Sequence, residues 1–145
     1  MTYKLPVSVL VVIHTESLEV LLLERALRPG LWQSVTGSLD RADEPLELAA
    51  AREVKEETAI DVASGRLSRW NVSNTFEIYL QWRHRFAPGV THNTEHVFSL
   101  ALPSRTPVTI AAAEHVAFQW LPWREAAEKC FSWSNRDAIR MLGGV

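Results

Sequence analysis

The stretch GSLDRADEPLELAAAREVKEETAI, residues 37–60, decides how the rest of this chain is interpreted. Pro45 suits the first position of a helix, because its missing N–H would be unpaired there in any case. Good helix formers, mainly leucine and alanine, follow it. The stretch therefore predicts a helix from Pro45 onward, with Glu53, Glu56 and Glu57 at i, i+3 and i+4 on one face.

The predicted helix has an apolar stripe, and two carboxylates fall within it. Leu46 and Val54 belong to this stripe, and Glu53 and Glu57 lie beside them at a turn of about 100° per residue. A carboxylate on a buried face is costly unless it is paired or binds a metal. A hard divalent cation such as Mg²⁺ would offset this cost, and it usually brings a phosphate-bearing substrate. The alternative is an acidic, solvated helix on which these glutamates only border the core.

The spacing of polar residues in this stretch resembles the Nudix box, in which a Gly and a Glu precede an Arg-Glu-apolar-x-Glu-Glu-x-Gly-apolar segment. The sequence departs from the box twice: one extra residue lies between Gly37 and Glu44, and Ala59 stands where the box has Gly. The extra residue only lengthens a loop, whereas Ala59 replaces the residue best able to take a left-handed helix end. Neither departure removes a carboxylate. The matching residues are Gly37, Glu44, Arg52, Glu53, Val54, Glu56, Glu57 and Ile60.

The Nudix resemblance implies a catalytic set of four glutamates. It implies that Glu53 and Glu57 bind the metal and that Glu114, in a loop before the segment VAFQWL, shares this task. Glu56 is expected to be a metal ligand or the general base. The implied metal is Mg²⁺, for which Mn²⁺ can substitute. An ordinary loop carboxylate is the alternative for Glu114.

The residues expected to bind substrate are spread along the chain. The resemblance implies that Lys4 reaches the phosphate or the base of the substrate and that Arg25 contacts the phosphates. Ordinary surface residues are the alternative for both. The segment FEIY, residues 76–79, offers an aromatic surface and a polar group for a heterocycle, with core packing as the default for Ile78. The complete expected substrate-binding set is Lys4, Arg25, Thr36, Phe76, Glu77, Ile78, Tyr79 and Ser132.

The predicted fold class is α/β (α+β), a Nudix-type α/β/α sandwich with a mixed central sheet, formed by one domain over residues 1–145. Residues 7–13 are β-branched and apolar on both faces, which predicts a buried central strand. Residues 75–85 are expected to form another strand, and residues 108–111 a short one. Ser134 is the expected N-cap of the last helix.

The segment HNTEH, residues 92–96, spells an inverted zinc-peptidase motif, which works only on a helix. Because the strand-like segment VFSLAL follows at once, a loop before a strand is the preferred interpretation.

The bulk properties exclude several classes of function. A net charge of −2 argues against general binding to nucleic acids or membrane surfaces, which requires a basic patch. Cys130 is the only cysteine, so an internal disulfide is impossible and a reducing compartment fits. No stretch approaches transmembrane length, and the N-terminus is not a convincing secretory signal. A cytoplasmic enzyme is expected, and its oligomeric state is left open.

The similarity extends beyond the box to a subgroup of the family. Several segments resemble bacterial dihydroneopterin triphosphate pyrophosphatases of folate synthesis: LWQSVTGS, TFEI, RHRFAPGVTHNTE and SWSNR. This resemblance implies release of pyrophosphate from dihydroneopterin triphosphate, with side activity on (deoxy)nucleoside triphosphates. A nucleotide-pool sanitising enzyme and a non-catalytic nucleotide-binding module are the alternatives, because residue chemistry alone does not separate a pterin from a purine.

Overall fold

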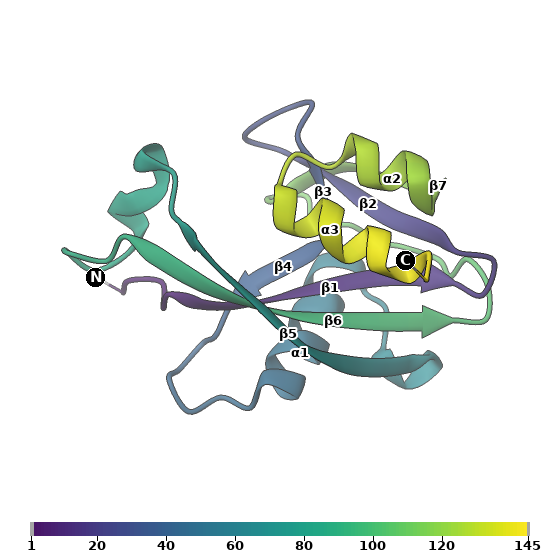
Figure 1. The fold of residues 1–145 in the computed structure, drawn as a ribbon, viewed down its shortest axis with the longest axis horizontal. Coiled ribbons are helices and arrows are strands. Elements are labelled where there is room, and N and C mark those ends of the chain that lie inside the picture. Colours follow the sequence, from purple (N-terminus) through teal and green to yellow (C-terminus); the bar gives the residue numbers. More distant parts are fainter. Residues whose placement is uncertain (1, 145) are drawn as a thin grey trace.

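The computed structural model describes residues 2–144 and contains a seven-stranded mixed sheet between layers of helix (Figure 1). This architecture confirms the predicted α/β/α sandwich. The strands are β1 (Val7–Thr15), β2 (Glu19–Arg25), β3 (Trp32–Gln33), β4 (Val35–Ser38), β5 (Arg66–Glu77), β6 (His92–Leu102) and β7 (His115–Pro122). The helices are α1 (Leu46–Thr58), α2 (Trp123–Lys129) and α3 (Trp133–Leu142), with short 3₁₀ helices η1 (Val62–Ser64) and η2 (Leu80–Arg85).

Strand β1 is the buried central strand that residues 7–13 predict. Its odd-numbered residues, such as Val9 and Val11, pack in a core with helix α1, and its even-numbered residues, such as Leu10 and Val12, pack in a second core with α2 and α3. Side chains of a strand alternate between the two faces of its sheet, so a strand covered on both sides must be apolar throughout.

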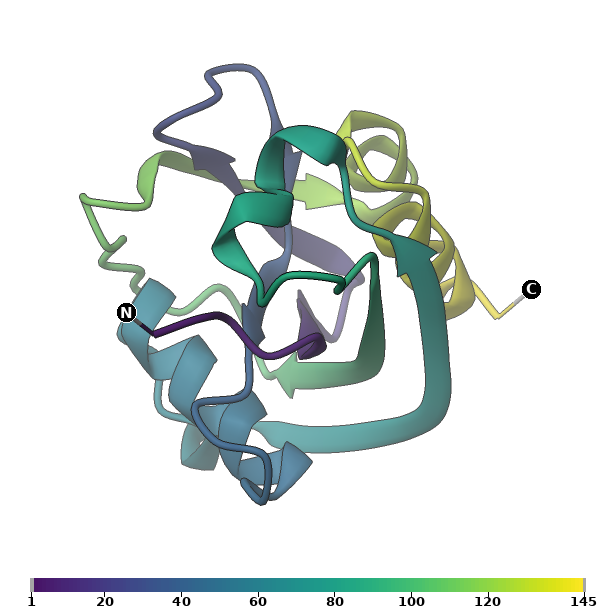
Figure 2. The same cartoon turned by 90° about the vertical axis from the view of Figure 1, so that its left-hand side faces the viewer.

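The sheet branches at β1. This strand pairs in parallel with β6 along its whole length and antiparallel with β4 from Ser8 to Val11. It meets β2 only at the pair His14–Val20, and β2 continues to β3 and β7. Residues from both branches line the large pocket described below. Figure 2 shows η2 at the end of the molecule where the N-terminal segment lies.

Helix α1 confirms the prediction from the box and excludes a purely solvated helix. Glu53 is 9% exposed and Glu57 only 1%, whereas Leu48 is half exposed. Ala59 ends the helix in the left-handed conformation, with φ 63° and ψ 9°, and its N–H donates to the Lys55 carbonyl. The alanine therefore adopts the conformation for which a glycine is normally used.

The predicted strand over residues 75–85 is wrong beyond Glu77. The chain turns at Ile78, whose N–H donates to the Thr91 carbonyl, and then forms η2. Side-chain contacts hold this turn: Arg83 Nε donates to the Ile78 carbonyl, and Tyr79 packs edge-on against Trp82 at 5.1 Å between ring centroids. Residues 78–85 have β propensity, but the contacts of the turn and of η2 determine their conformation.

The interpretation of HNTEH as a loop is also wrong, because β6 begins at His92. A strand places His92 and His96 on the face opposite Glu95, so the helical arrangement that the zinc motif needs is not formed.

Two smaller predictions near the C-terminus are wrong. Residues 108–111 form no strand in the described chain, although Val108 and Ile110 still pack against the first core. Ser132, rather than Ser134, is the N-cap of α3, and its Oγ accepts the Asn135 N–H. The serine two residues earlier has the extended backbone that an N-cap requires.

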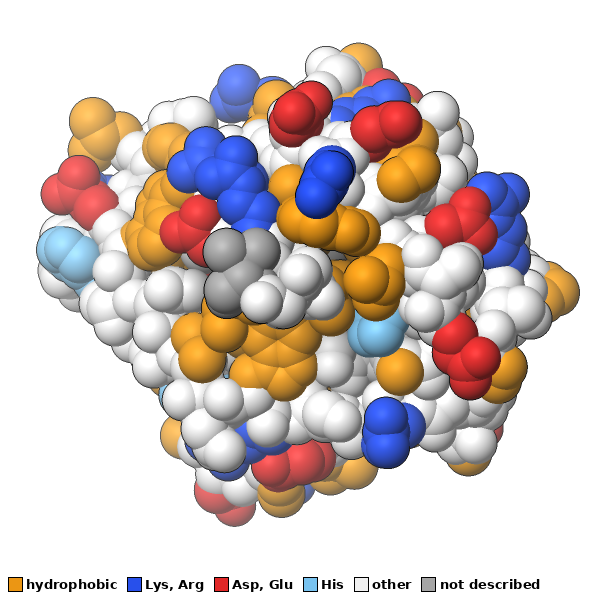
Figure 3. Space-filling view, turned by 45° about the vertical axis from the view of Figure 1, so that its right-hand side comes forward, with side chains coloured by type: hydrophobic (Ala, Val, Ile, Leu, Met, Phe, Trp, Pro, Cys, Tyr) orange, Lys and Arg blue, Asp and Glu red, His pale blue; other side chains and the backbone are white. Residues whose placement is uncertain are grey.

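The surface has mixed charge, with acidic and basic side chains interspersed on the face shown in Figure 3. Among residues 2–144, no helix combines the length and the apolar character needed to span a bilayer.

Candidate active site

A pocket of about 820 Å³ lies where the two branches of the sheet meet α1, η2 and the start of α3. All but one of the sequence-predicted site residues line it, although they come from distant parts of the chain. The structure brings together Lys4, Arg25, Thr36, Glu53, Glu57, Phe76, Glu77, Ile78, Tyr79, Glu114 and Ser132. Their individual roles stay predictions.

Glu53 reaches the pocket because Gly37 has no side chain. A Cβ placed on Gly37, in β4, would overlap the carboxylate of Glu53. The glycine thus leaves the space through which a carboxylate from α1 enters the cavity. Gly37 also lines this pocket, which explains why the box needs a glycine at a position whose backbone any residue could adopt.

Arg52 fixes the position of this carboxylate. Its Nη1 donates to Glu53 Oε1 at 2.7 Å, while Nε and Nη2 donate to the two oxygens of Glu44, each at 3.0 Å. Glu44 is 6% exposed and also accepts the Asp40 N–H at 2.8 Å. Glu44 thus pairs with Arg52 near the start of the helix, and the bidentate geometry pre-organises Arg52 toward Glu53.

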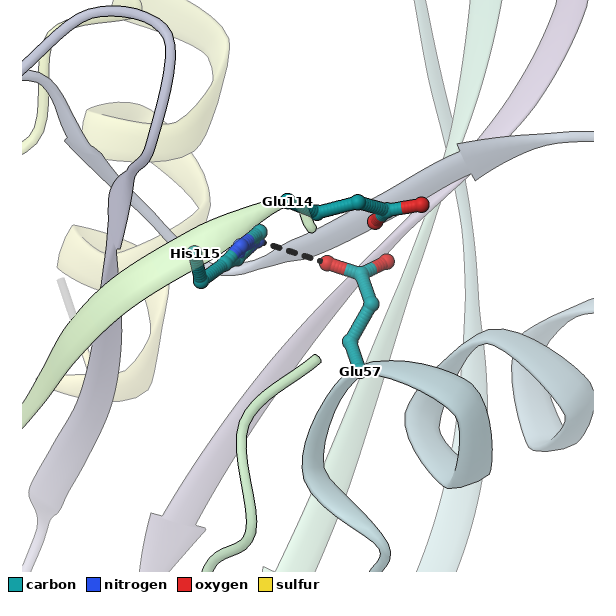
Figure 4. A group of neighbouring side chains, drawn as sticks. All are labelled: Glu57, Glu114 and His115. Carbon is teal, nitrogen blue, oxygen red and sulfur yellow. Dashed lines mark hydrogen bonds and ion pairs between the residues drawn. The ribbon is translucent and has the colours of Figure 1, made fainter. Parts of the chain in front are cut away.

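Glu57, Glu114 and His115 form a second cluster at the pocket, and Figure 4 shows their side chains converging from α1 and from the start of β7. One ligand atom from each residue lies within 4.8 Å of the others. The Nε2 of His115 is 3.1 Å from Glu57 Oε1, while Glu57 Oε2 is buried and has no hydrogen-bond partner within residues 2–144. An orphaned buried carboxylate oxygen beside a second carboxylate fits a divalent cation.

The electrostatics of this cluster agree with a cation site. Burial is the main cause that raises the pKa of Glu57 well above its ordinary value, and the neighbouring Glu53, Glu114 and Glu56 raise it further. Burial also raises the pKa of Glu53, although Arg52 opposes this effect. Carboxylates that repel one another in a buried place would be stabilised by a bound divalent cation, and oxygen donors suit Mg²⁺ or Mn²⁺.

Glu56 is the one predicted site residue that does not line the pocket. Its side chain is 58% exposed and lies 3.5 Å from Arg52 Nη1. Its predicted role as metal ligand or base stays a prediction.

Positive charge also gathers at the pocket, around Lys4 and Arg25. Burial is the main cause that lowers the pKa of Lys4, and the nearby Arg85 contributes to this shift. Arg25 Nη1 donates to Gln33 Oε1 at 3.0 Å, and the guanidinium stacks on Trp82 at 4.9 Å from the ring centroid. Cations held close together in this way are suited to a polyanion such as a triphosphate.

Several residues that line the pocket are not among the site residues predicted from the sequence. The strand predicted over residues 75–85 contains Trp82 and Arg85. The structure places both in η2, where they line the pocket. Asn93 and Glu95 were placed in a loop, and only the register of β6 against β1 reveals that they line the cavity. A sequence signal existed for His115, which follows the predicted ligand Glu114. The segments RHRFAPGVTHNTE and SWSNR, which resemble the subgroup, contain most of the others. The missed lining residues are Trp82, Arg85, Asn93, Glu95, His115 and Asn135.

The comparison with known families agrees with this geometry. The NUDIX domain model matches residues 4–142. The chain belongs to the Nudix family. This confirms the family indicated by residues 37–60.

Similar proteins cover nearly the whole chain. Dihydroneopterin triphosphate diphosphatase of Escherichia coli (strain K12) is 49% identical over 143 residues, which are 97% of this chain and 93% of the relative. The enzyme of that name from Haemophilus influenzae is 39% identical over 144 residues, 97% of this chain and 89% of the relative. The structure of the E. coli dihydroneopterin triphosphate pyrophosphohydrolase superposes with a TM-score of 0.90 at 46% identity, covering 98% of this chain and 97% of the other.

Proposed function

We propose that this Nudix enzyme hydrolyses 7,8-dihydroneopterin triphosphate to the monophosphate and pyrophosphate. The observation that carries the proposal is the meeting of Glu53, Glu57 and Glu114 with Lys4 and Arg25 in one pocket. Relatives of 49% and 39% identity that bear the name dihydroneopterin triphosphate diphosphatase support the choice of substrate.

The pocket offers two chemically different regions, as such a substrate requires. Carboxylates and cations suit a metal-bound triphosphate, while Ile78, Trp82 and Phe131 offer apolar and aromatic surface for a bicyclic heterocycle. A volume of about 820 Å³ is within the usual range for a ligand site.

We propose that Glu53 and Glu57 hold Mg²⁺, with Glu114 beside them and Mn²⁺ able to substitute. When bound, the metal would neutralise charge on the phosphate oxygens. Arg52 holds the Glu53 carboxylate in place, and Lys4 and Arg25 neutralise further phosphate charge. A carboxylate accepts the proton of the attacking water, and Glu56 is the candidate for this task.

The test is pyrophosphate release from dihydroneopterin triphosphate and from a panel of ribo- and deoxynucleoside triphosphates, with Mg²⁺, with Mn²⁺ and with excess chelator. We expect the highest kcat/KM for the pterin and loss of turnover with chelator. Glu53→Gln should abolish turnover while leaving substrate binding measurable. The exposed change Glu128→Gln, on α2, is the control and should leave turnover unchanged.

Two alternatives predict other outcomes of this experiment. Equal efficiency on purine triphosphates would identify a nucleotide-pool sanitising enzyme. Absence of turnover on every substrate, together with nucleotide binding that survives Glu53→Gln, would identify a binding module. The three box carboxylates Glu53, Glu56 and Glu57 favour an enzyme over such a module.

A cytoplasmic location without nucleic-acid or membrane partners is part of the proposal. It is supported by the net charge of −2 and by the buried free thiol of Cys130.

A further inference from the structure

Two buried oxygen atoms at the pocket have no hydrogen-bond partner within residues 2–144. They are Oε1 of Glu95 and Oδ1 of Asn93, and each of these residues is only 6% exposed. Both residues line the pocket. Buried acceptors are almost always paired, so two orphans beside a cavity indicate that a ligand supplies the donors.

Strand β6 places these two acceptors side by side. Asn93 and Glu95 are two residues apart and therefore point to one face, about 7 Å apart along the strand. Val97 is the next residue of β6 on this face, and it packs in the core that contains residues of α2 and α3. The acceptors thus mark the place where the apolar core gives way to the pocket.

The surroundings do not neutralise Glu95. Among residues 2–144, Glu95 has no ion-pair partner, and the Ser134 hydroxyl lies near its carboxyl group. Asn93 uses its Nδ2 to donate to Ser8 Oγ at 2.8 Å, which leaves its carbonyl oxygen free. A buried carboxylate without a cation is costly in the free protein, and it is suited to a ligand with several N–H groups.

Resting on the proposed function, we propose that Glu95, with Asn93 beside it, determines specificity by accepting hydrogen bonds from the ring N–H and amino group of a 2-amino-4-oxo heterocycle. A pterin and a guanine both present these adjacent donors, which a carboxylate accepts in a bidentate manner. An adenine presents a bare ring nitrogen next to its amino group, so one carboxylate oxygen would face a lone pair. The Glu95 carboxylate therefore favours heterocycles that present both donors side by side.

This role of Glu95 is separate from the metal end. Glu95 belongs to β6, whereas the metal-binding candidates belong to α1 and the start of β7. Replacing the Glu95 carboxylate should change the relative kcat/KM values of substrates that differ in their heterocycle. It should not change the hydrolysis of the phosphate chain. A merely structural role would instead lower turnover of all substrates together and lower the melting temperature.

The test compares wild type, Glu95→Gln and the exposed control Glu128→Gln on four triphosphates. The substrates are dihydroneopterin triphosphate, dGTP and dITP, which differs from dGTP only by the missing 2-amino group; dATP is the reference. In wild type, kcat/KM for dGTP should exceed that for dITP by about 10-fold or more, as expected for a bidentate contact. In Glu95→Gln this ratio should approach one, while turnover of dATP is unchanged or faster. The pterin should lose about as much efficiency as dGTP.

Stability provides the check on folding. Glu95→Gln removes a buried charge and keeps the shape of the side chain, so the melting temperature should not fall. An unchanged dGTP-to-dITP ratio in Glu95→Gln, or an equal loss on all four substrates, would overturn the inference.

A binding experiment separates this inference from the proposed function. Calorimetry with guanosine, inosine and 7,8-dihydroneopterin needs no hydrolysis and no phosphate. Wild type should bind guanosine and dihydroneopterin about 10-fold more tightly than inosine, and Glu95→Gln should lose this difference. If hydrolysis fails but this binding pattern appears, the proposed function is wrong and the inference stands. If wild type binds guanosine and inosine equally, the inference is wrong whatever the enzyme hydrolyses.

Discussion

The carboxylate of Glu53 occupies the space in which a Cβ on Gly37 would stand. The two residues are far apart in the box, and their contact joins helix α1 to strand β4. This contact explains how a side chain from the helical layer reaches a pocket at the branch point of the sheet.

Gly37→Ala should therefore lower activity far more than stability. The backbone of Gly37 lies in a strand and tolerates alanine, so the new methyl group acts by displacing the Glu53 carboxylate from the position in which Arg52 holds it. Misplacement of a catalytic group by about 1 Å can cost about 100-fold in rate. We expect a loss of that order in kcat and a change of about 1 kcal/mol or less in the free energy of unfolding.

A double-mutant cycle with Glu53→Gln provides the control for this prediction. If the methyl group acts only through Glu53, Gly37→Ala should cause no further loss in the Glu53→Gln background. A loss of the same size in both backgrounds would show that Gly37 acts by another route.

Glu44→Gln should reduce stability and make it less dependent on pH. Hydrogen bonds from Arg52 are the main cause that holds the pKa of Glu44 below its ordinary value. A carboxyl group with a lowered pKa in the folded state contributes stability above its unfolded pKa of about 4.3, and this contribution is lost as pH falls through the folded value. We expect a loss of about 2 kcal/mol at pH 7 and a shallower decline below about pH 4.

Urea unfolding between pH 3 and pH 7 would measure this effect, and Asp43→Asn is its neighbouring control. The carboxylate of Asp43 is 85% exposed and pairs with Arg41 at the surface, so this change should cost little. If the free energy of unfolding depends on pH equally in Glu44→Gln and wild type, the Arg52–Glu44 pair does not stabilise the fold as predicted.

Ala59→Gly should stabilise the protein, although glycine usually destabilises a helix. Ala59 has φ 63°, a left-handed conformation that a side chain disfavours and a glycine adopts freely. Relief of this strain exceeds the added entropy of the unfolded chain, so we expect a gain of about 0.5–1 kcal/mol. The free energy of unfolding in urea measures it.

The matched control is Ala51→Gly, the same substitution inside α1. It should cost about 1 kcal/mol, because the backbone there is right-handed helix. Destabilisation by both substitutions would show that Ala59 carries no strain that glycine relieves.

Arg25→Ala should weaken binding of the phosphate chain. Arg25 lines the pocket, and its Nε is buried without a hydrogen-bond partner in the described structure. Loss of a charge-assisted contact should raise KM about 10-fold or more. Inhibition by inorganic tripolyphosphate should weaken by a similar factor, which separates phosphate from heterocycle binding. The control is Arg28→Ala, in the exposed loop after β2, which should leave KM and the inhibition constant of tripolyphosphate unchanged. An equal effect of Arg25→Ala and Arg28→Ala would show that Arg25 acts only through long-range electrostatics.

The sequence by itself determined the box helix and its buried carboxylates, because both follow from local spacing. The period of a helix fixes which residues share a face, and this placed Glu53 and Glu57 on the buried side without knowledge of any partner. The apolar run from Val7 likewise indicated a strand covered on two faces. The left-handed end at Ala59 could be suspected only because a family pattern has glycine there.

The tertiary structure alone decided how η2 and β6 contribute to the pocket. Trp82 lies over Arg25 because the chain leaves β5 after Glu77 and folds into η2, against the β propensity of that segment. Glu95 lies at the cavity because β6 pairs in parallel with β1, where Ser8 is its partner. Such pairings depend on residues more than eighty positions apart, and no local pattern specifies them. The sequence therefore indicated the carboxylates and cations of the site, and the register of the sheet decided that Asn93 and Glu95 line the pocket.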